Sequence, residues 1–344
     1  MTLRAIYEVA APAKLNLFLH VVGRRGDGYH LLESLFVLID WSDTLHFETR
    51  EDGSLMRHDL GAALPPDDLC LRAARALQAA SGTALGADIL IDKQVPWGAG
   101  LGGGSSDAAS TLLALNRLWG LQWSRSRLLA LGLTLGADVP FFLGGRNAFV
   151  EGIGERLTPV LVPHQWLAVL KPAASIETRA IFASPLLVQG QVQTQVQTQV
   201  QTQVQTQVQS QLQSQLQSQL QNQPHGPSHG PVHGLAANAD AAILESLSPN
   251  AESARFARML EPGFGRNDLQ PAAQAECAEV AQAAAAFHRH FGNSRMTGSG
   301  SAVFARAGGA EHASKPMPLD IPAAWVGRMS RSLVEHPLVG WAEG

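Results

Sequence analysis

The sequence predicts a two-domain protein of mixed α/β (α+β) class, and three observations support this. Its 344 residues exceed the usual size of one domain, and either half is long enough to bury a core. A strand, a glycine-rich loop and a helix follow one another between residues 87 and 119. A short apolar strand at residues 166–170 is expected to open the second domain. The predicted domains are therefore 1–165 and 166–344, the second interrupted at 189–235.

The segment 87–119 is centred on a loop with five glycines in the seven positions 98–104. Residues 87–92 alternate as in a strand, and Leu112, Leu115 and Leu118 recur at helical spacing. Glycine lets backbone N–H groups turn toward a ligand, and a helix N-terminus adds unpaired donors and roughly half a positive charge. The loop therefore predicts an anion site, most often a phosphate site.

Other interpretations of this loop fit the residues less well. A Walker loop requires Gly-Lys-Ser/Thr, and no lysine follows these glycines. Gly98, Gly100 and Gly103 match the dinucleotide pattern G-x-G-x-x-G, but no acidic residue lies between Asp107 and Asp138 to bind a ribose. A turn that binds nothing needs fewer glycines, because each one weakens the folded state entropically.

Composition narrows the function classes. A net charge of −4 and a pI of about 6.3 argue against a nucleic-acid binder. Cys70 and Cys277 form no C-x-x-C pattern and fit the reduced thiols of a cytosolic protein. There is no signal peptide and no apolar run of about eighteen residues, so the sequence predicts a cytoplasmic protein with no membrane segment.

Polar residues gather on a predicted strand near the N-terminus. Residues 5–22 alternate so that Lys14, Asn16 and His20 share one face. A cation and an amide on one face suit a clamp on a phosphate or hydroxyl, although an ordinary edge strand gives the same pattern. The loop that follows ends in Tyr29-His30, which suits stacking on a planar base or a plain surface loop.

Asp138 is an acidic residue in an unusual setting. It lies between small and apolar residues in Gly136-Ala137-Asp138-Val139-Pro140, directly after a predicted helix at 128–135. Carboxylates are rarely buried without a partner, so this residue is expected to be either catalytic or part of a structural ion pair. Lys14 is the candidate partner.

The remaining segments are assigned by pattern. In the first half, the predicted elements are two strands within 31–49 with a turn near Asp43, a helix at 67–81 and a hairpin at 147–157. In the second half, they are an alanine-rich helix from 267 to about 291, a Gly/Ser loop at 294–301 before a strand, and a weak helix after 316. Within 189–223 glutamine occupies every odd position, which predicts a poorly ordered excursion. His225, His229 and His233 follow in Gly-Pro repeats that favour a linker over a metal site, and a helix is expected at 236–260.

Three separated motifs resemble those of the GHMP family of small-molecule kinases. Pro12–Leu17 resembles the first motif of the family, Pro96–Ala109 its ATP loop and Thr297–Ser301 its C-terminal glycine motif. Two further markers, residues 27–30 and 136–140, are closest to a member that acts in the non-mevalonate isoprenoid pathway. The resemblance covers nearly the whole chain outside 189–235.

The resemblance implies a ribosomal-protein-S5-like N-terminal half and a ferredoxin-like C-terminal half, with the site between them. It implies transfer of the γ-phosphoryl group of ATP, with Mg²⁺, to a tertiary 2-hydroxyl of a small cytidyl-diphosphate substrate, by a monomer or weak homodimer. By the same resemblance, Asp138 is the base or orienter of that hydroxyl, Lys14 lies beside it and holds it ionised, and Asn16 positions the polyol.

Further residues are assigned by this resemblance alone. Tyr29 and Phe182 are expected to sandwich the cytosine while His30 reads its edge, and Thr178, Gly298 and Ser299 are the other expected substrate contacts. The expected ATP-binding residues are Lys93, Pro96, Gly98, Gly100, Leu101, Gly102, Gly103, Gly104, Ser105 and Ser106. Ser105 or Ser106 is the candidate Mg²⁺ ligand, with Ser106 the one chosen.

The chain departs from the family at three places. Asp68 stands where the family usually has asparagine near the adenine, Trp97 is bulkier than expected, and the insertion at 189–223 follows Phe182 closely. The alternatives are another GHMP kinase acting on mevalonate, homoserine or a sugar, a glutamine-rich association scaffold without catalysis, and a nicotinamide-dependent oxidoreductase. The Tyr29-His30 pair favours the cytidyl-diphosphate substrate over the other GHMP kinase substrates, because only an acceptor that carries a base needs an aromatic stack there.

Overall fold

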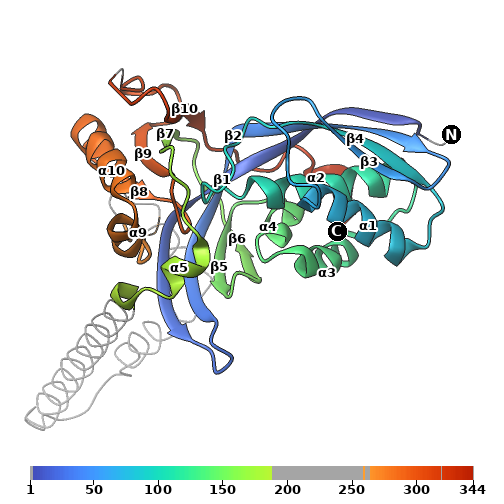
Figure 1. Ribbon diagram of the computed structural model, residues 1–344, viewed down its shortest axis with the longest axis horizontal. Helices are drawn as coiled ribbons and strands as arrows, with labels where there is room; N and C mark the ends of the chain where they lie inside the picture. The colour runs from blue at the N-terminus through green and yellow to red at the C-terminus, as the bar shows by residue number, and fades with distance from the viewer. Residues whose placement is uncertain (1–2, 188–258, 260–263, 319, 344) are drawn as a thin grey trace, which may run out of the picture. The chain divides into compact units, whose positions relative to one another are not determined.

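The computed structural model describes residues 3–187, 259, 264–318 and 320–343. These residues form two sheets with helices packed on them, so the predicted mixed α/β class is confirmed (Figure 1). The predictions for the glutamine repeat at 189–223, for the three histidines at 225–233 and for a helix at 236–260 lie outside the described residues. No helix in the described ranges is long and apolar enough to cross a membrane.

The first sheet has the strand order β3-β4-β2-β5-β6, with β1 paired to β2 beside this path. All neighbouring pairs are antiparallel except β3 and β4. The strands are β1 (Ala5–Arg24), β2 (His30–Arg50), β3 (Leu55–Asp59), β4 (Gly86–Asp92), β5 (Ala148–Gly152) and β6 (Arg156–Pro159). The pairing of β5 with β6 confirms the predicted hairpin at 147–157.

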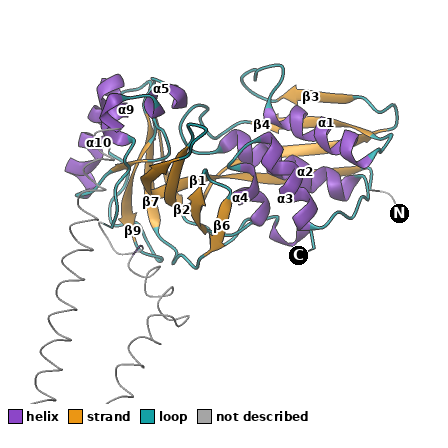
Figure 2. Cartoon of the chain, turned by 90° about the horizontal axis from the view of Figure 1, so that it is seen from below, coloured by secondary structure: helices purple, strands orange, loops and turns teal. Residues whose placement is uncertain are grey.

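Four helices cover one face of this sheet (Figure 2). They are α1 (Leu69–Ser81), α2 (Gly103–Leu118), α3 (Arg125–Leu135) and α4 (Val139–Gly144). Helix α2 is buried along most of its length because its apolar positions face both the sheet and the neighbouring helices. Its burial fixes the helix start, and the glycine loop leads directly into that start.

The predicted turn near Asp43 is wrong. Residues 30–50 form the single strand β2, and Asp43 is fully buried within it. The carboxylate accepts hydrogen bonds from the backbone N–H groups of Gln94 and Val95 at 2.6 and 2.7 Å. The polar residues that suggested a turn are therefore tertiary contacts, since a buried carboxylate is stable where fixed donors satisfy it.

The second sheet has the order β10-β7-β9-β8. Its strands are β7 (Trp166–Lys171), β8 (Arg295–Met296), β9 (Val303–Gly308) and β10 (Val326–Arg331). Helices α5 (Thr178–Phe182), α9 (Gln270–Glu276) and α10 (Ala278–Phe291) accompany it (Figure 1). The changeover between the sheets falls between Pro159 and Trp166. Strand β8 takes up the start of the loop expected at 294–301, and β9 follows the loop as predicted.

Two helix predictions in this half are wrong. The alanine-rich segment is broken at Cys277, whose φ of −137° and ψ of 106° are extended, so it forms α9 and α10 rather than one helix. The tail after residue 316 contains strand β10 and a short 3-10 turn, Val339–Trp341, in place of a weak helix. Pairing of β10 with β7 decides the first part of the tail, because a sheet neighbour outweighs weak local propensity.

Strand β1 belongs to both cores of the described chain. Val9 and Ala11 pack in the core under α1–α4, whereas Leu19 and Val21 pack with β7, β9, α9 and α10. The strand also reaches the second half by backbone bonds, since Leu19 N–H donates to Arg266 C=O at 2.9 Å. Lys14 and Asn16 lie between these two packed ends, which fixes their position.

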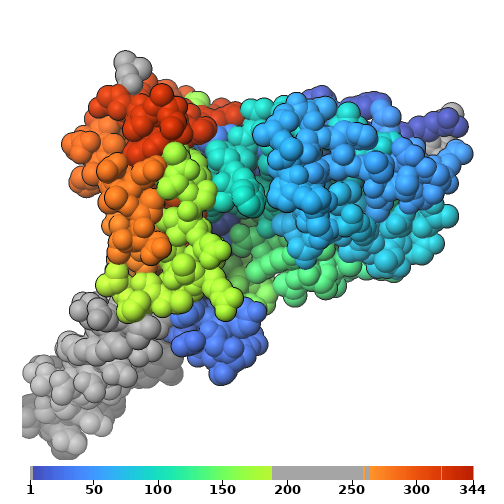
Figure 3. Space-filling view, viewed as in Figure 1, coloured from blue at the N-terminus to red at the C-terminus, as the bar shows by residue number. Residues whose placement is uncertain are grey.

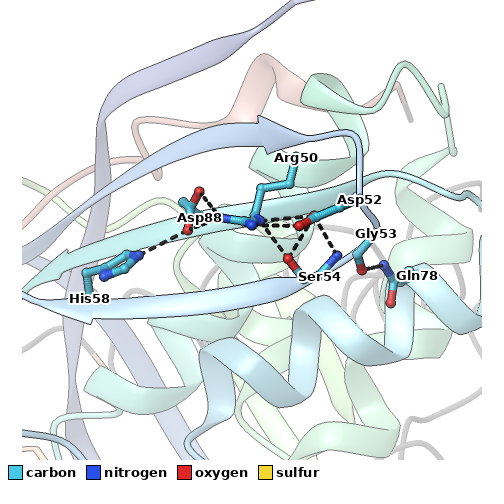
Figure 4. Close-up of polar contacts among 7 residues, drawn as sticks. All are labelled: Arg50, Asp52, Gly53, Ser54, His58, Gln78 and Asp88. Atoms are coloured by element: carbon cyan, nitrogen blue, oxygen red, sulfur yellow. Dashed lines mark hydrogen bonds and ion pairs between the residues drawn. The ribbon is translucent and has the colours of Figure 1, made fainter.

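A polar network on the first sheet holds its outer strand β3 (Figure 4). Arg50 forms ion pairs with Asp52 and Asp88, at 2.6 and 2.9 Å, and donates to the Ser54 hydroxyl at 2.6 Å. His58 of β3 meets Asp88 of β4 at 3.0 Å. These contacts join β2 and β4 to the outer strand β3, so we assign the network to strand attachment.

Candidate active site

Two glycine loops from opposite halves of the sequence touch at the backbone. The loop at 98–104 precedes α2, and the loop at 297–301 joins β8 to β9. Ala302 N–H donates to Ala99 C=O at 3.1 Å, and Lys14 N–H of β1 donates to Leu101 C=O at 2.9 Å. The three predicted motifs therefore meet at one place in the fold.

The first loop has the conformation that its glycines allow. Gly98, Gly100 and Gly102 have φ between 64° and 74°, a region that other residues rarely adopt. Gly102 is the N-cap residue of α2 and makes no side-chain cap bond, so the free N–H groups of the first helical turn remain available. This is the geometry expected of a phosphate site.

Two pockets share this loop. The first is a cavity of about 260 Å³, and the second runs along the loop toward Leu69. Gly98, Gly100 and Gly102 line both. Figure 3 shows the recess between the yellow-green segment that contains α5 and the cyan-to-teal segment that contains the loop.

The first pocket contains most of the predicted catalytic and substrate residues. Those that line it are Lys14, Asn16, Asp138, Thr178, Phe182, Gly298 and Ser299. The pocket draws on both halves, because β1, β2, α5 and the second glycine loop all contribute. The second pocket is lined by nine of the ten predicted ATP-binding residues, namely Lys93, Pro96, Gly98, Gly100, Leu101, Gly102, Gly103, Gly104 and Ser105.

Lys14 is the buried cation of the first pocket. Its ammonium lies 3.6 Å from Asp138 Oδ2, donates to Asn16 Oδ1 at 2.6 Å and sits 4.5 Å from the centroid of the Phe36 ring. Burial lowers the pKa of Lys14, and the carboxylate of Asp138 opposes that shift. The predicted pairing of Lys14 with Asp138 is therefore present.

Asp138 is more accessible than the sequence suggested. Its side chain is 33% exposed, against 4% for Lys14. It stands at the N-cap position of α4 but makes no side-chain cap bond, so its carboxylate accepts no hydrogen bond from the N–H groups at the start of that helix. A partly exposed carboxylate beside a buried cation can accept a hydrogen bond from a group that enters the pocket.

Asn16 links this pair to the second half of the chain. Its amide nitrogen donates to Ser34 Oγ at 2.9 Å, and its backbone N–H donates to Thr297 Oγ1 at 2.9 Å. The Asn16 side-chain oxygen already accepts from Lys14, so Asn16 orients the lysine as well as lining the pocket. The sequence identified Asn16 but not Ser34 or Phe36, which lie on β2 with no local motif to mark them.

Lys93 and Ser106 are less available to a ligand than the other predicted residues. The Lys93 ammonium is bound by Asp43 and by Asp107, the latter at 2.6 Å. Ser106 is fully buried on α2, lines neither pocket, and its hydroxyl has no hydrogen-bond partner in the described part of the chain. Ser105 lies in the second pocket and is the better placed hydroxyl.

Asp68, the departure near the expected adenine site, is neutralised locally. It is the N-cap residue of α1, accepting from Leu71 N–H at 3.1 Å, and it forms an ion pair with Arg57 at 2.8 Å. Asp59 holds the other side of the same guanidinium at 2.7 Å. Trp97, the second departure, is 74% exposed and lines the second pocket.

The predicted base-binding residues are brought together only in part. The His30 and Phe182 rings stack with centroids 5.2 Å apart. Tyr29 is 62% exposed and lines neither pocket. Burial lowers the pKa of His30, with Arg24 adding to the shift, which favours the neutral ring that can read a base edge.

Comparison with known proteins agrees with this geometry. Residues 68–146 match the GHMP kinases N terminal domain. The 4-diphosphocytidyl-2-C-methyl-D-erythritol kinase of Methylibium petroleiphilum is 56% identical over 344 residues, covering 99% of this chain and 100% of that protein. This chain belongs to that kinase family. The Variovorax paradoxus member is 48% identical, with 99% of this chain and 100% of that protein covered.

Solved structures place the family within a wider fold. A 4-(cytidine 5'-diphospho)-2C-methyl-D-erythritol kinase is 31% identical with a TM-score of 0.62, covering 94% of this chain and 98% of that one. A homoserine kinase from Cytophaga hutchinsonii is 15% identical with a TM-score of 0.55, covering 98% and 96%. The second likeness is one of fold alone, so the family assignment rests on the first and on the sequence relatives.

Proposed function

We propose that this chain is an ATP-dependent kinase that phosphorylates the 2-hydroxyl group of 4-diphosphocytidyl-2-C-methyl-D-erythritol. The observation that carries the proposal is the wall of Gly98, Gly100 and Gly102 shared by the two pockets. A phosphoryl donor in the second pocket and an alcohol in the first would meet across this wall. The Lys14–Asp138 pair lies on the alcohol side.

The donor side acts through the backbone. The glycines open space for phosphate oxygens, and the free N–H groups at the start of α2 supply donors and the positive end of the helix dipole. Phosphoryl transfer depends mainly on positioning and charge stabilisation, which rigid backbone donors provide. The contact of the loop with Thr297 and Gly300 stiffens this cradle.

The acceptor side acts through side chains. Asp138 accepts a hydrogen bond from the substrate hydroxyl group and orients its oxygen toward the γ-phosphoryl group. Lys14 holds the carboxylate in place and stabilises the negative charge that develops on the transferred group. Asn16 keeps the ammonium directed into the pocket through its side-chain oxygen.

A magnesium ion fits this site only together with ATP. No group of three His, Cys, Asp or Glu side chains suited to a metal exists in the described ranges. Mg²⁺ is commonly held by one or two protein oxygens plus substrate phosphates, and Ser105 in the second pocket is the best placed hydroxyl for this. When bound, the ion would neutralise phosphate charge.

The cytidyl end of the substrate would occupy the side of the first pocket near α5. Phe182 and Thr178 line the pocket there, and the Thr178 hydroxyl bonds that of Ser299 at 2.7 Å. The stacked His30 and Phe182 rings offer an aromatic face with a polar edge beside it. We propose that the base displaces or extends this stack.

We further propose the cytoplasm as the location of the protein, since both Cys70 and Cys277 are free thiols.

The test is ADP release from the purified protein with Mg-ATP and each candidate acceptor. Turnover is expected with 4-diphosphocytidyl-2-C-methyl-D-erythritol and not with mevalonate, homoserine or galactose. Asp138→Asn should reduce kcat roughly 10²–10⁴-fold. Asp67→Asn, at an exposed acid that pairs with Arg75, is the matched control and should leave kcat unchanged. Turnover with another acceptor alone, or an active Asp138→Asn variant, would contradict the proposal.

A further inference from the structure

A buried cluster of three charges lies beneath the first glycine loop. The Lys93 ammonium binds one oxygen of Asp43 and one of Asp107. The side chains of Asp43 and Asp107 are 0% and 3% exposed, and that of Lys93 is 13% exposed. Burial raises the pKa of Asp107, and the pair with Lys93 opposes the shift. Such a cluster is costly to desolvate, so it calls for an explanation beyond stability.

The three residues come from the elements on either side of the loop. Lys93 directly follows β4, Asp107 lies in the first turns of α2, and Asp43 is in the middle of β2. The ion pairs therefore join both ends of the loop to each other and to the sheet. A further bond, from Trp41 Nε1 to Gln94 C=O at 2.8 Å, holds the same end of the loop.

The other oxygen of Asp43 fixes the entry to the loop, since it accepts from Gln94 N–H and Val95 N–H. The helix start is packed against the same residues. A Cβ atom on Gly103 would lie 3.1 Å from Val95 Cγ1 and 3.4 Å from Lys93 Nζ. The helix start therefore packs close to Val95 and Lys93, and the ion pair with Asp107 ties it to the Lys93 ammonium.

We propose that Asp43, Lys93 and Asp107 form a clamp that sets the opening of the first glycine loop, and that Lys93 is a positioning residue. On this view Lys93 affects nucleotide binding through the loop and not by contact with a phosphate oxygen. The inference rests on the proposed function only in taking this loop as the ATP site.

The decisive measurement is hydrogen exchange of the loop amides in the full chain without nucleotide. In Lys93→Met/Asp107→Asn, which removes one charge of each sign, the peptide spanning residues 94–106 should exchange about 10-fold faster than in the unmodified protein. Peptides from β7 and β9 should be unchanged. Arg75→Met, which removes the cation of an exposed ion pair with Asp67, is the matched control and should change neither.

Kinetics supply a second readout. The double variant should raise KM for ATP at least tenfold, with KM for the acceptor unchanged. The double variant could instead bind ATP more weakly while its loop amides, without nucleotide, exchange at the normal rate. That result would overturn the clamp and assign Lys93 to direct contact with the nucleotide. If the double variant fails to fold, Asp107→Asn, which keeps the Lys93–Asp43 pair, must show faster loop exchange than the unmodified protein, and normal exchange would overturn the proposal. Faster exchange in a protein without kinase activity would instead leave the clamp standing and remove the proposed function.

Discussion

A Cβ atom on Gly100 would lie 2.5 Å from the carbonyl oxygen of Thr297. These residues are nearly two hundred positions apart, and they bring the two glycine motifs into direct backbone contact. Gly298 mirrors the arrangement, since its own Cβ would lie 3.0 Å from Gly100 C=O. The glycines are thus required for two reasons, to open a phosphate site and to let the two loops approach.

Gly100→Ala should destabilise the protein more than its backbone conformation alone explains. Gly82 is the matched control, because its φ of 69° is close to the 74° of Gly100 but nothing lies within 4 Å of its Cβ position. Gly82→Ala should cost about 1 kcal/mol from the left-handed conformation. Gly100→Ala adds the clash with Thr297, so its thermal unfolding midpoint should be clearly lower than that of Gly82→Ala. Equal midpoints would show that the two loops separate easily.

Lys14→Met should raise stability while removing activity. Because burial lowers the pKa of Lys14, the unfolded chain holds this proton more tightly than the folded protein does. Stability therefore rises as pH rises from the lowered folded-state value toward the ordinary 10.5. Methionine carries no charge to desolvate, and water can solvate the partly exposed Asp138 carboxylate that loses its partner. The unfolding free energy near pH 7, measured by denaturant unfolding, should therefore rise.

The control for this prediction is Lys315→Met, which replaces an exposed lysine and should leave stability nearly unchanged. A lower stability of Lys14→Met than of the unmodified protein would contradict the prediction. It would mean that the bond to Asn16 and the contact with Phe36 outweigh the cost of burying the charge.

Asp68→Asn should leave KM for ATP nearly unchanged. Arg57 already neutralises this carboxylate and keeps a second partner in Asp59, so the pocket gains little from removing the charge. Asparagine also retains the helix cap, whereas Asp68→Ala should lose about 1 kcal/mol of unfolding free energy. Steady-state kinetics and thermal unfolding of the two variants separate these effects. A large fall in KM for ATP in Asp68→Asn would mean that the Asp68 carboxylate weakens nucleotide binding directly.

His336 should make the fold acid-sensitive. Its Nδ1 accepts from Leu338 N–H at 3.1 Å, and burial, with Arg125 nearby, lowers its pKa from 6.5 to about 3. Below pH 6.5, His336 is protonated in the unfolded chain but stays neutral in the folded protein. The free energy of unfolding therefore falls by about 1.4 kcal/mol per pH unit until about pH 3.

His336→Asn, which keeps an acceptor but does not titrate, should remove that part of the acid sensitivity. The comparison is the unfolding free energy at several pH values between 3 and 6.5. His312→Asn, at an exposed histidine, is the control and should keep the original slope. An unchanged slope in His336→Asn would assign the acid sensitivity to other groups.

The sequence predicted the parts of the site that are encoded locally. The glycine loop, the strand with Lys14 and Asn16, and the pairing of Lys14 with Asp138 follow from residue types and spacing, and the structure contains each of them. The roles of these residues remain proposals. Local propensity also identified α1, which was predicted as a helix at 67–81.

What the sequence missed depends on contacts distant in the chain. Asp43 looks like a turn residue until Gln94 and Val95 are seen to donate to it. The same holds for Lys93, which a motif assigns to ATP but whose ammonium two carboxylates bind. The break at Cys277 and the strand β10 were missed because sheet and core packing decide them, and neither leaves a periodic signal.

The hydrogen bond from Asn16 N–H to Thr297 Oγ1 spans 281 positions of the chain. Contacts of such separation form slowly, because a long loop must close before any of its interactions are gained. We therefore expect the pocket residues to come together late in folding. Refolding experiments should regain helical signal well before ATP-dependent turnover. A fragment that lacks either half would fold, at best, into a scaffold without a catalytic centre.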